Sequence, residues 1–132
     1  MLNVSDYRVS SGQSEVLHGL NFEVKPREIV AIMGRNGMGK TTLMKSLMGV
    51  IPSSGGSVQL DNKEVSRLKS FERVKSGFGF VPQGRMIFST MTVRENIETG
   101  LTTTNRRSVP SELYDLFPVL LEMRNRRGGN LS

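Results

Sequence analysis

One glycine-rich segment stands out in the first half of this 132-residue chain: Gly34-Arg35-Asn36-Gly37-Met38-Gly39-Lys40-Thr41. It has the spacing G-x-x-x-x-G-K-[ST], which is typical of loops that bind phosphate groups between a buried strand and a helix. Residues 29–33 are apolar throughout, as in a short strand covered on both faces. From Thr41 the apolar side chains recur at helical spacing, and Gly49 and Pro52 provide a stop. The sequence therefore predicts a buried strand, a phosphate loop and a helix of about nine residues.

The residue types in this loop fit a polyphosphate ligand. The glycines allow backbone dihedrals that point N–H groups at an anion. Lys40 can reach the terminal phosphates, Thr41 offers a hydroxyl to Mg²⁺, and the helix N-terminus adds a partial positive charge. Thr42 can donate a further hydrogen bond. The candidate nucleotide-binding residues are Gly34, Arg35, Asn36, Gly37, Met38, Gly39, Lys40, Thr41 and Thr42.

A second polar group follows a second apolar segment. Residues 78–81 are predicted to form another buried strand, which Pro82 ends, and Gln83 comes directly afterwards. In open α/β sheets, ligands bind beyond the carboxyl ends of the strands, where Gln83 would share a rim with the phosphate loop. We expect its amide to bind Mg²⁺ or to position water.

The remaining pattern predicts strands first and helices later. Loose alternation over residues 2–9 and clean alternation over 20–24 predict two half-buried strands, with a break at 25–28. Residues 57–65 are predicted to form a hairpin that turns at Asp61-Asn62. A short helix is expected around residues 71–75.

Helices are predicted after residue 90. Thr92 and Glu95 form a capping-box pattern, Ser111 is expected to cap a short helix, and Pro118 to open another one through Met123. Polar loops are expected at 101–108 and 124–129.

Composition excludes several classes of protein. The chain has no Cys, which excludes disulfides and thiolate metal sites and fits a reducing compartment. Its longest promising apolar stretch, 116–121, is interrupted by Pro118, whereas about 20 residues are needed to span a bilayer. No secretory signal is recognised at the start, so we expect a cytosolic chain. The net charge of +6 comes mainly from arginines of the second half. These could meet phosphates or an anionic membrane, but aromatic side chains interleaved for nucleic-acid binding are lacking around them.

At this point the residues resemble a known family: 34–42 are similar to the Walker A segment, and Val81-Pro82-Gln83 to the Q-loop, of ATP-binding-cassette (ABC) ATPases. The runs 32–40, 82–88 and 92–97 look most like ATPases of importers for branched-chain amino acids, and among these like urea importers. The resemblance covers essentially the whole chain. The transported solute stays open between urea and branched-chain amino acids or amides.

The resemblance implies an α/β fold of the P-loop NTPase class, in its N-terminal portion. Residues 1–90 would hold the antiparallel β sheet and part of a RecA-like core with the Walker A segment and Q-loop. Residues 91–132 would begin the helical subdomain.

The resemblance also implies roles and partners. Lys40 and Gln83 would be catalytic, Thr41 and Gln83 would bind the metal, and the cofactors would be ATP and Mg²⁺. Leu131-Ser132 resembles the first two residues of the LSGGQ signature, so Ser132 is expected to contact the γ-phosphate held by a partner cassette. The expected partners are transmembrane permease subunits and an identical or homologous ATPase subunit in a head-to-tail dimer. The expected location is the inner face of the cell membrane, on the cytoplasmic side.

Two departures from the family pattern change what we expect of this chain. The family has an aromatic residue before the glycine at Gly12 to stack on adenine, whereas this chain has Ser10-Ser11, and Tyr7 looks like a core residue. No apolar strand ends in Asp-Glu, so a Walker B carboxylate and its adjacent Glu are missing. We therefore expect weak Mg-ATP binding at best and no appreciable ATPase activity from this chain alone.

Further expectations concern stability, His18 and alternative functions. The strand before Gly34 should expose apolar edges for want of neighbours. The only histidine, His18, is expected to be an ordinary surface or turn residue.

The alternative functions for this chain are a nucleotide-binding fragment without transport or hydrolysis, or an unrelated P-loop kinase or GTPase. No Asn-Lys-x-Asp guanine-binding motif occurs in the sequence.

Overall fold

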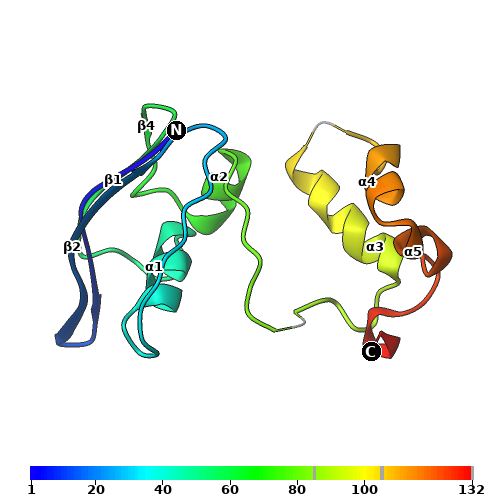
Figure 1. The fold of residues 1–132 in the computed structure, drawn as a ribbon, viewed down its shortest axis with the longest axis horizontal. Helices are drawn as coiled ribbons and strands as arrows, with labels where there is room; N and C mark the ends of the chain where they lie inside the picture. The colour runs from blue at the N-terminus through cyan, green and yellow to red at the C-terminus, as the bar shows by residue number, and fades with distance from the viewer. Residues whose placement is uncertain (85, 105, 132) are drawn as a thin grey trace. The chain divides into compact units, whose positions relative to one another are not determined.

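The computed structural model describes residues 1–84, 86–104 and 106–131. The chain divides into two compact units, Met1–Phe80 and Val81–Ser132 (Figure 1). The division follows Phe80, whereas the sequence placed a boundary near residue 90. The assignment of these units to family subdomains stays a prediction.

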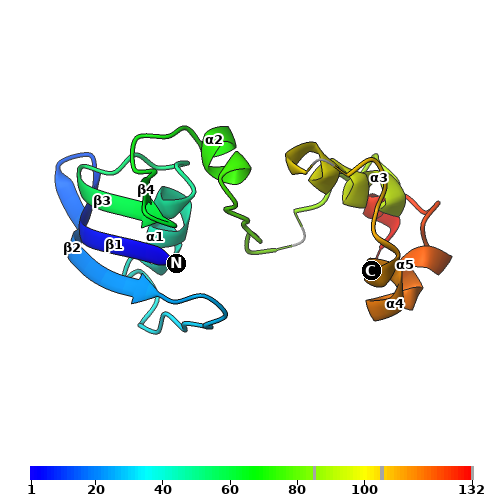
Figure 2. The same ribbon diagram turned by 90° about the horizontal axis from the view of Figure 1, so that it is seen from above.

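The first unit is built on an antiparallel sheet. Its strands are β1 (Leu2–Ser11), β2 (Ser14–Val24), β3 (Gly55–Leu60) and β4 (Lys63–Glu64), in the order β2-β1-β3-β4 (Figure 2). The predicted strands at 2–9 and 20–24 are confirmed and extend into one long hairpin. The predicted hairpin at 57–65 is confirmed as well, because Asp61 and Asn62 connect β3 to β4 with φ angles of 49° and 63°.

A bulge in β1 explains why its sequence alternates only loosely. The register with β2 shifts between Val4 and Tyr7, and Asp6 within the bulge has a φ of 44°. The extra residue lets Val4, Tyr7 and Val9 all reach the buried side of the sheet, although an uninterrupted strand would turn Val4 and Tyr7 to opposite faces. Tyr7 is fully buried, which confirms that it is a core residue.

Helix α1 (Lys40–Leu47) covers the sheet and closes the core. It is eight residues long, close to the predicted nine. Helix α2 (Ser70–Lys75) confirms the short helix expected around 71–75. Burial of the apolar side chains between α1 and the sheet is the main stabilising contribution in this unit. The buried cluster consists of Val4, Tyr7, Val9, Leu17, Leu43, Leu47, Val58 and Val65.

The two predicted buried strands, 29–33 and 78–81, do not form. Both segments are irregular, and Ile29 and Met33 are 98% and 90% exposed. A strand needs hydrogen-bonded neighbours, and within the described residues no strand pairs with either segment. The prediction of strands was therefore wrong, whereas the expected exposure of apolar side chains before Gly34 is observed. Together these segments and α1 border an apolar hollow of about 220 Å³.

The second unit contains short helices: α3 (Val93–Glu98), η1 (Thr99–Thr103), α4 (Ser111–Leu116), α5 (Pro118–Glu122) and η2 (Gly128–Asn130). The capping box is confirmed, since the Thr92 hydroxyl accepts from the Glu95 N–H at 3.2 Å and the Glu95 carboxylate accepts from the Thr92 N–H at 2.7 Å.

Three details of the second unit differ from the prediction. The cap position before α4 is Pro110, and Ser111 is the first helical residue. The expected loops at 101–108 and 124–129 contain parts of η1 and η2, because backbone carbonyls there accept bonds from N–H groups three residues on.

Among the described residues, no helix has both the length and the apolar character that crossing a membrane requires.

Candidate functional site

The glycine-rich loop forms a tight turn that leads directly into α1. Gly37 and Gly39 have φ angles of 83° and 87°, a region that side-chain-bearing residues rarely adopt. Position 39 also requires glycine for steric reasons, since a Cβ there would lie 2.9 Å from Leu17 Cδ2. The Leu43 N–H donates to the Gly39 carbonyl at 2.8 Å and so makes the first helical bond. The loop is thus fixed by its own dihedrals and by packing against β2.

Lys40 places a cation over this loop. Its Nζ donates to the carbonyl oxygens of Gly34 at 2.6 Å and Arg35 at 2.7 Å. The ammonium therefore lies at the N-terminus of α1, where backbone N–H groups already carry partial positive charge. Positive charge and glycine-rich backbone in one place form an environment suited to an anion.

A hollow of about 560 Å³ borders the loop. Lys40 is one of the residues in its wall, and the volume of the hollow falls within the usual range for small-molecule sites. The wall is otherwise mostly apolar. Its residues are Glu15, Val16, Leu17, His18, Leu20, Ile32, Met33, Gly37, Met38, Gly39, Lys40 and Leu43.

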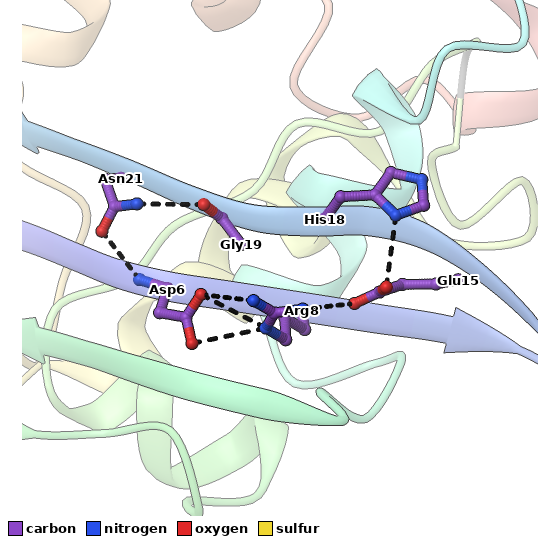
Figure 3. A network of polar contacts seen from close by, with 6 residues as sticks. All are labelled: Asp6, Arg8, Glu15, His18, Gly19 and Asn21. Carbon is purple, nitrogen blue, oxygen red and sulfur yellow. Dashed lines mark hydrogen bonds and ion pairs between the residues drawn. The ribbon is translucent and has the colours of Figure 1, made fainter.

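A polar network on β1 and β2 ends at this wall (Figure 3). Arg8 lies between Asp6, at 2.9 Å, and Glu15, at 3.4 Å, and Glu15 contacts His18 Nδ1 at 3.2 Å. The hydrogen bond to Asp6 and then the negative charges of Asp6 and Glu15 raise the pKa of Arg8. His18 is a surface residue within β2, in agreement with the surface alternative of the prediction.

The position of the missing aromatic residue is occupied by exposed serines. Ser10 donates from its Oγ to Ser54 Oγ at 3.2 Å, and Ser11 ends β1. Tyr7 is fully buried beneath the sheet, so it cannot offer a ring to a ligand at the surface. Among the described residues that border the 560 Å³ hollow, none is aromatic apart from His18 with its imidazole.

The predicted site residues are divided between the two units. Residues 34–42 form one continuous loop and first helical turn, in which Thr41 is exposed and Thr42 half-buried. Gln83 is exposed and belongs to the second unit, whereas Lys40 belongs to the first, so a shared site of the two stays a prediction. Ser132 lies outside the described residues.

The chemistry of Mg²⁺ is compatible with these residues. In the part of the chain that the structure describes, no three His, Cys, Asp or Glu side chains are grouped to hold a metal ion. Mg²⁺ in nucleotide sites is commonly held by one or two protein groups together with phosphate oxygens and water. The exposed Thr41 hydroxyl at the start of α1 could supply one such group.

Arg73, in α2, is a buried residue beside α1 that the sequence pattern did not single out. It is only 3% exposed and donates from Nη1 to the carbonyl oxygens of Ser46 and Leu47, at the C-terminal end of α1. An arginine in a short polar helix is normally exposed, and its partners lie 26 and 27 residues away in sequence, so no local signal could reveal this burial.

Comparison with known proteins gives consistent matches. Residues 17–130 match the ABC transporter family. The high-affinity branched-chain amino acid transport ATP-binding protein BraG of Pseudomonas aeruginosa is 33% identical over 135 residues, which cover all of this chain and 58% of BraG. The probable branched-chain amino acid transport ATP-binding protein LivF of Archaeoglobus fulgidus is 32% identical over 130 residues, which cover 95% of this chain and 55% of LivF. The chain thus spans a little over half the length of these curated relatives.

Solved structures agree on the fold. An ATP-binding cassette determined as a dimer in a post-hydrolysis state, bound to ADP and Pi, aligns with a TM-score of 0.77 at 25% identity. The alignment covers all of this chain and 63% of that one. An ATP-binding subunit of an ABC transporter aligns with a TM-score of 0.81 at 21% identity, over all of this chain and 56% of that subunit.

These matches confirm the resemblance seen in the sequence and the α/β class with an antiparallel sheet. They also set aside an unrelated P-loop kinase or GTPase, because the family match covers most of the chain. With a phosphate-type loop at the start of α1 and relatives that align over its full length, this chain belongs to the ABC transporter family.

Proposed function

We propose that this chain provides the phosphate-binding part of the ATP-binding subunit of an ABC importer. In the full-length protein, ATP binding and hydrolysis would power uptake of a solute. The observation that carries the proposal is the position of Lys40, whose ammonium closes a positive-φ glycine loop at the N-terminus of α1, beside the 560 Å³ hollow that Lys40 helps to line.

The proposed ligand is Mg-ATP. Residues 34–42 would wrap the phosphates, Lys40 would neutralise their terminal charge, and Thr41 and Gln83 would bind Mg²⁺. Ser132 would contact the γ-phosphate held by a partner cassette. Binding to this chain should be weak, because Ser10-Ser11 replaces a stacking aromatic that contributes about 1–3 kcal/mol per base.

The proposed solute is a branched-chain amino acid, urea or an amide. The names of BraG and LivF support the first of these. The similarity of residues 82–88 to urea-importer ATPases supports urea. Ribose import ATP-binding protein RbsA of Oceanobacillus iheyensis is 42% identical over 96 residues, which cover 73% of this chain. Because ATP-binding proteins named for different solutes match the same residues, sequence similarity alone does not select the solute. Permease subunits and a second cassette are the proposed partners, at the inner face of the membrane.

Hydrolysis by these 132 residues alone should be negligible. Phosphoryl transfer depends on positioning and on stabilisation of negative charge, and Lys40 with Thr41 supplies only part of this. The carboxylate that would complete the Mg²⁺ site and the one that would activate water have no counterpart in the sequence.

Titration of Mg-ATP by calorimetry tests the proposal with two matched variants. Lys40→Ala removes the cation at the loop, whereas Lys45→Ala removes an equally charged but exposed side chain from the last turn of the same helix. Loss of a charge-assisted hydrogen bond costs about 1.5–3 kcal/mol, so Lys40→Ala should weaken binding at least about tenfold. Lys45→Ala should bind as the original chain does. Equal affinity of Lys40→Ala and the original chain would overturn the proposal.

A further inference from the structure

We propose that Arg73 is a positioning residue for the nucleotide site: it holds the C-terminal end of α1 and ties the segment that leads to Gln83 to this helix. The inference rests on the proposed function, because α1 carries Lys40 and Thr41 at its other end. It concerns a residue that contacts no nucleotide and acts only through α1.

The first part of the inference is the contact of Arg73 with α1. Arg73 Nη1 donates to the Ser46 carbonyl at 2.9 Å and the Leu47 carbonyl at 2.7 Å. The last carbonyls of a helix have no partner within the helix and carry partial negative charge. The Ser46 carbonyl also accepts from the Gly49 N–H at 2.9 Å. The buried guanidinium adds a donor to both carbonyls and a positive charge at this end of the helix, and the full burial of Ser46 keeps water away from these bonds.

The second part is that the same guanidinium also binds the loop before α2. Its Nε donates to the Leu68 carbonyl at 3.0 Å, and its Nη2 donates to the Ser66 carbonyl. The planar arrangement of N–H groups in Arg suits such divergent bonds, whereas a Lys ammonium is a single point with three donors. Arg73 thus joins the end of α1 to two positions of a loop about twenty residues further along the chain.

The chain after α1 is shaped to admit this side chain. Gly49 has a φ of 70°, and a Cβ there would lie 3.0 Å from Arg73 Nε. The left-handed dihedral and the absent side chain at Gly49 therefore leave the space that the guanidinium occupies.

The third part is the backbone of Arg73. Its carbonyl accepts from the N–H groups of Ser76 at 3.0 Å and Phe78 at 3.1 Å. Phe78 stands five positions before Gln83 in the sequence. One residue thus contacts α1 through its side chain and the segment entering the Q-loop through its carbonyl group.

The consequence for the nucleotide site follows from the shortness of α1. A helix of eight residues is about 12 Å long, and its successive backbone hydrogen bonds link its two ends, so release of the C-terminal end is expected to be transmitted to the N-terminal end. Loss of the guanidinium should therefore displace Lys40 and the amides of Gly37 and Gly39, although none of them touches Arg73.

The test compares Arg73→Lys with Arg67→Met, a control at an exposed arginine, in ¹⁵N-labelled protein at a temperature where both are folded. Without nucleotide, Arg73→Lys should shift the amide resonances of Gly37 and Gly39. The dissociation constant of Arg73→Lys for Mg-ATP should be about three- to tenfold higher than that of the original chain. The dissociation constant of Arg67→Met should equal that of the original chain. A folded Arg73→Lys with unchanged resonances and unchanged affinity would overturn the inference.

A measurement on the original chain decides the matter even where Arg73→Lys fails to fold. The Arg73 Nε–H resonance should shift when Mg-ATP is added, because α1 and its carbonyls adjust as the phosphates bind. An Nε–H resonance that stays fixed at saturating Mg-ATP would contradict the coupling. If the original chain binds no Mg-ATP, the proposed function fails, and the nucleotide-free resonances of Gly37 and Gly39 in Arg73→Lys still test the positioning role.

Discussion

The Lys40 ammonium lies 2.6 Å from the carbonyl oxygen of Gly34, six residues earlier, so the cation closes the loop in which it stands. Together with the bond to Arg35, this contact keeps the positive charge at the N-terminus of α1. A phosphate that enters must offer Lys40 oxygens that replace these carbonyls. The charged oxygens of a polyphosphate can do so, because bonds between two charged groups are stronger than bonds to neutral carbonyls.

The two positive-φ glycines of the loop should respond differently to alanine. Gly39→Ala introduces backbone strain and a Cβ 2.9 Å from Leu17 Cδ2, whereas Gly37→Ala meets no atom within 4 Å. We expect Gly37→Ala to lower the free energy of unfolding by about 1 kcal/mol and Gly39→Ala by about 2–4 kcal/mol. Urea unfolding of both variants measures the difference, and equal losses would contradict the close packing of Gly39 on β2.

Stability should fall in acid partly through Glu64. Its carboxylate accepts bonds from Ser57, Ser66 and Val58. Partial burial alone would raise the pKa of Glu64, but these hydrogen bonds outweigh it and lower the pKa to about 2. The folded state therefore favours the ionised carboxylate, and the stabilisation is fully present above the ordinary pKa of 4.5 and lost as the pH falls toward 2.

Glu64→Gln isolates this contribution. At pH 7 the variant should be less stable by about 1 kcal/mol, a value reduced for the exposure of Glu64 to solvent. The difference in free energy of unfolding between the two proteins should shrink between pH 5 and about 2, as the Glu64 carboxylate of the original chain takes up its proton. Urea midpoints at several pH values check this, and a gap that stays constant down to pH 2 would contradict the assignment.

The capping box should govern the start of α3. Thr92→Ala removes the acceptor for the Glu95 N–H and should weaken the helix by about 1 kcal/mol. Hydrogen exchange of the α3 amides measures this loss as faster exchange. The control is Thr102→Ala, because Thr102 donates only to the Thr99 carbonyl at 2.8 Å within η1 and caps no helix N-terminus. Similar effects of both variants would argue against the cap.

Local patterns in the sequence predicted the elements whose stability is local or antiparallel. Alternation in β2, the Asp61-Asn62 turn and the Thr92–Glu95 box each depend on neighbours a few residues away, and all are present. The bulge at Asp6 was hidden in the loose alternation of β1. It could be recognised only from which side chains are buried.

Features that depend on distant parts of the chain were not predictable in the same way. Residues 29–33 and 78–81 have the composition of buried strands, but a strand exists only where another backbone bonds to it, and composition does not reveal that. The burial of Arg73 likewise depends on carbonyls of α1 that are remote in sequence. The loop at residues 34–41 was recognisable because its dihedrals, its cation and the helix after it are all encoded within a few residues.

The central claim is that this loop binds the phosphates of a nucleotide, and a comparison of ATP, ADP, AMP and adenosine tests it most directly. The dissociation constants are measured by titration of the same protein in the presence of Mg²⁺. The affinity should fall in the order ATP, ADP, AMP, and adenosine should bind least, because the contacts come from Lys40 and the loop amides rather than from a stacking ring. Equal affinities for ATP and adenosine would contradict the account.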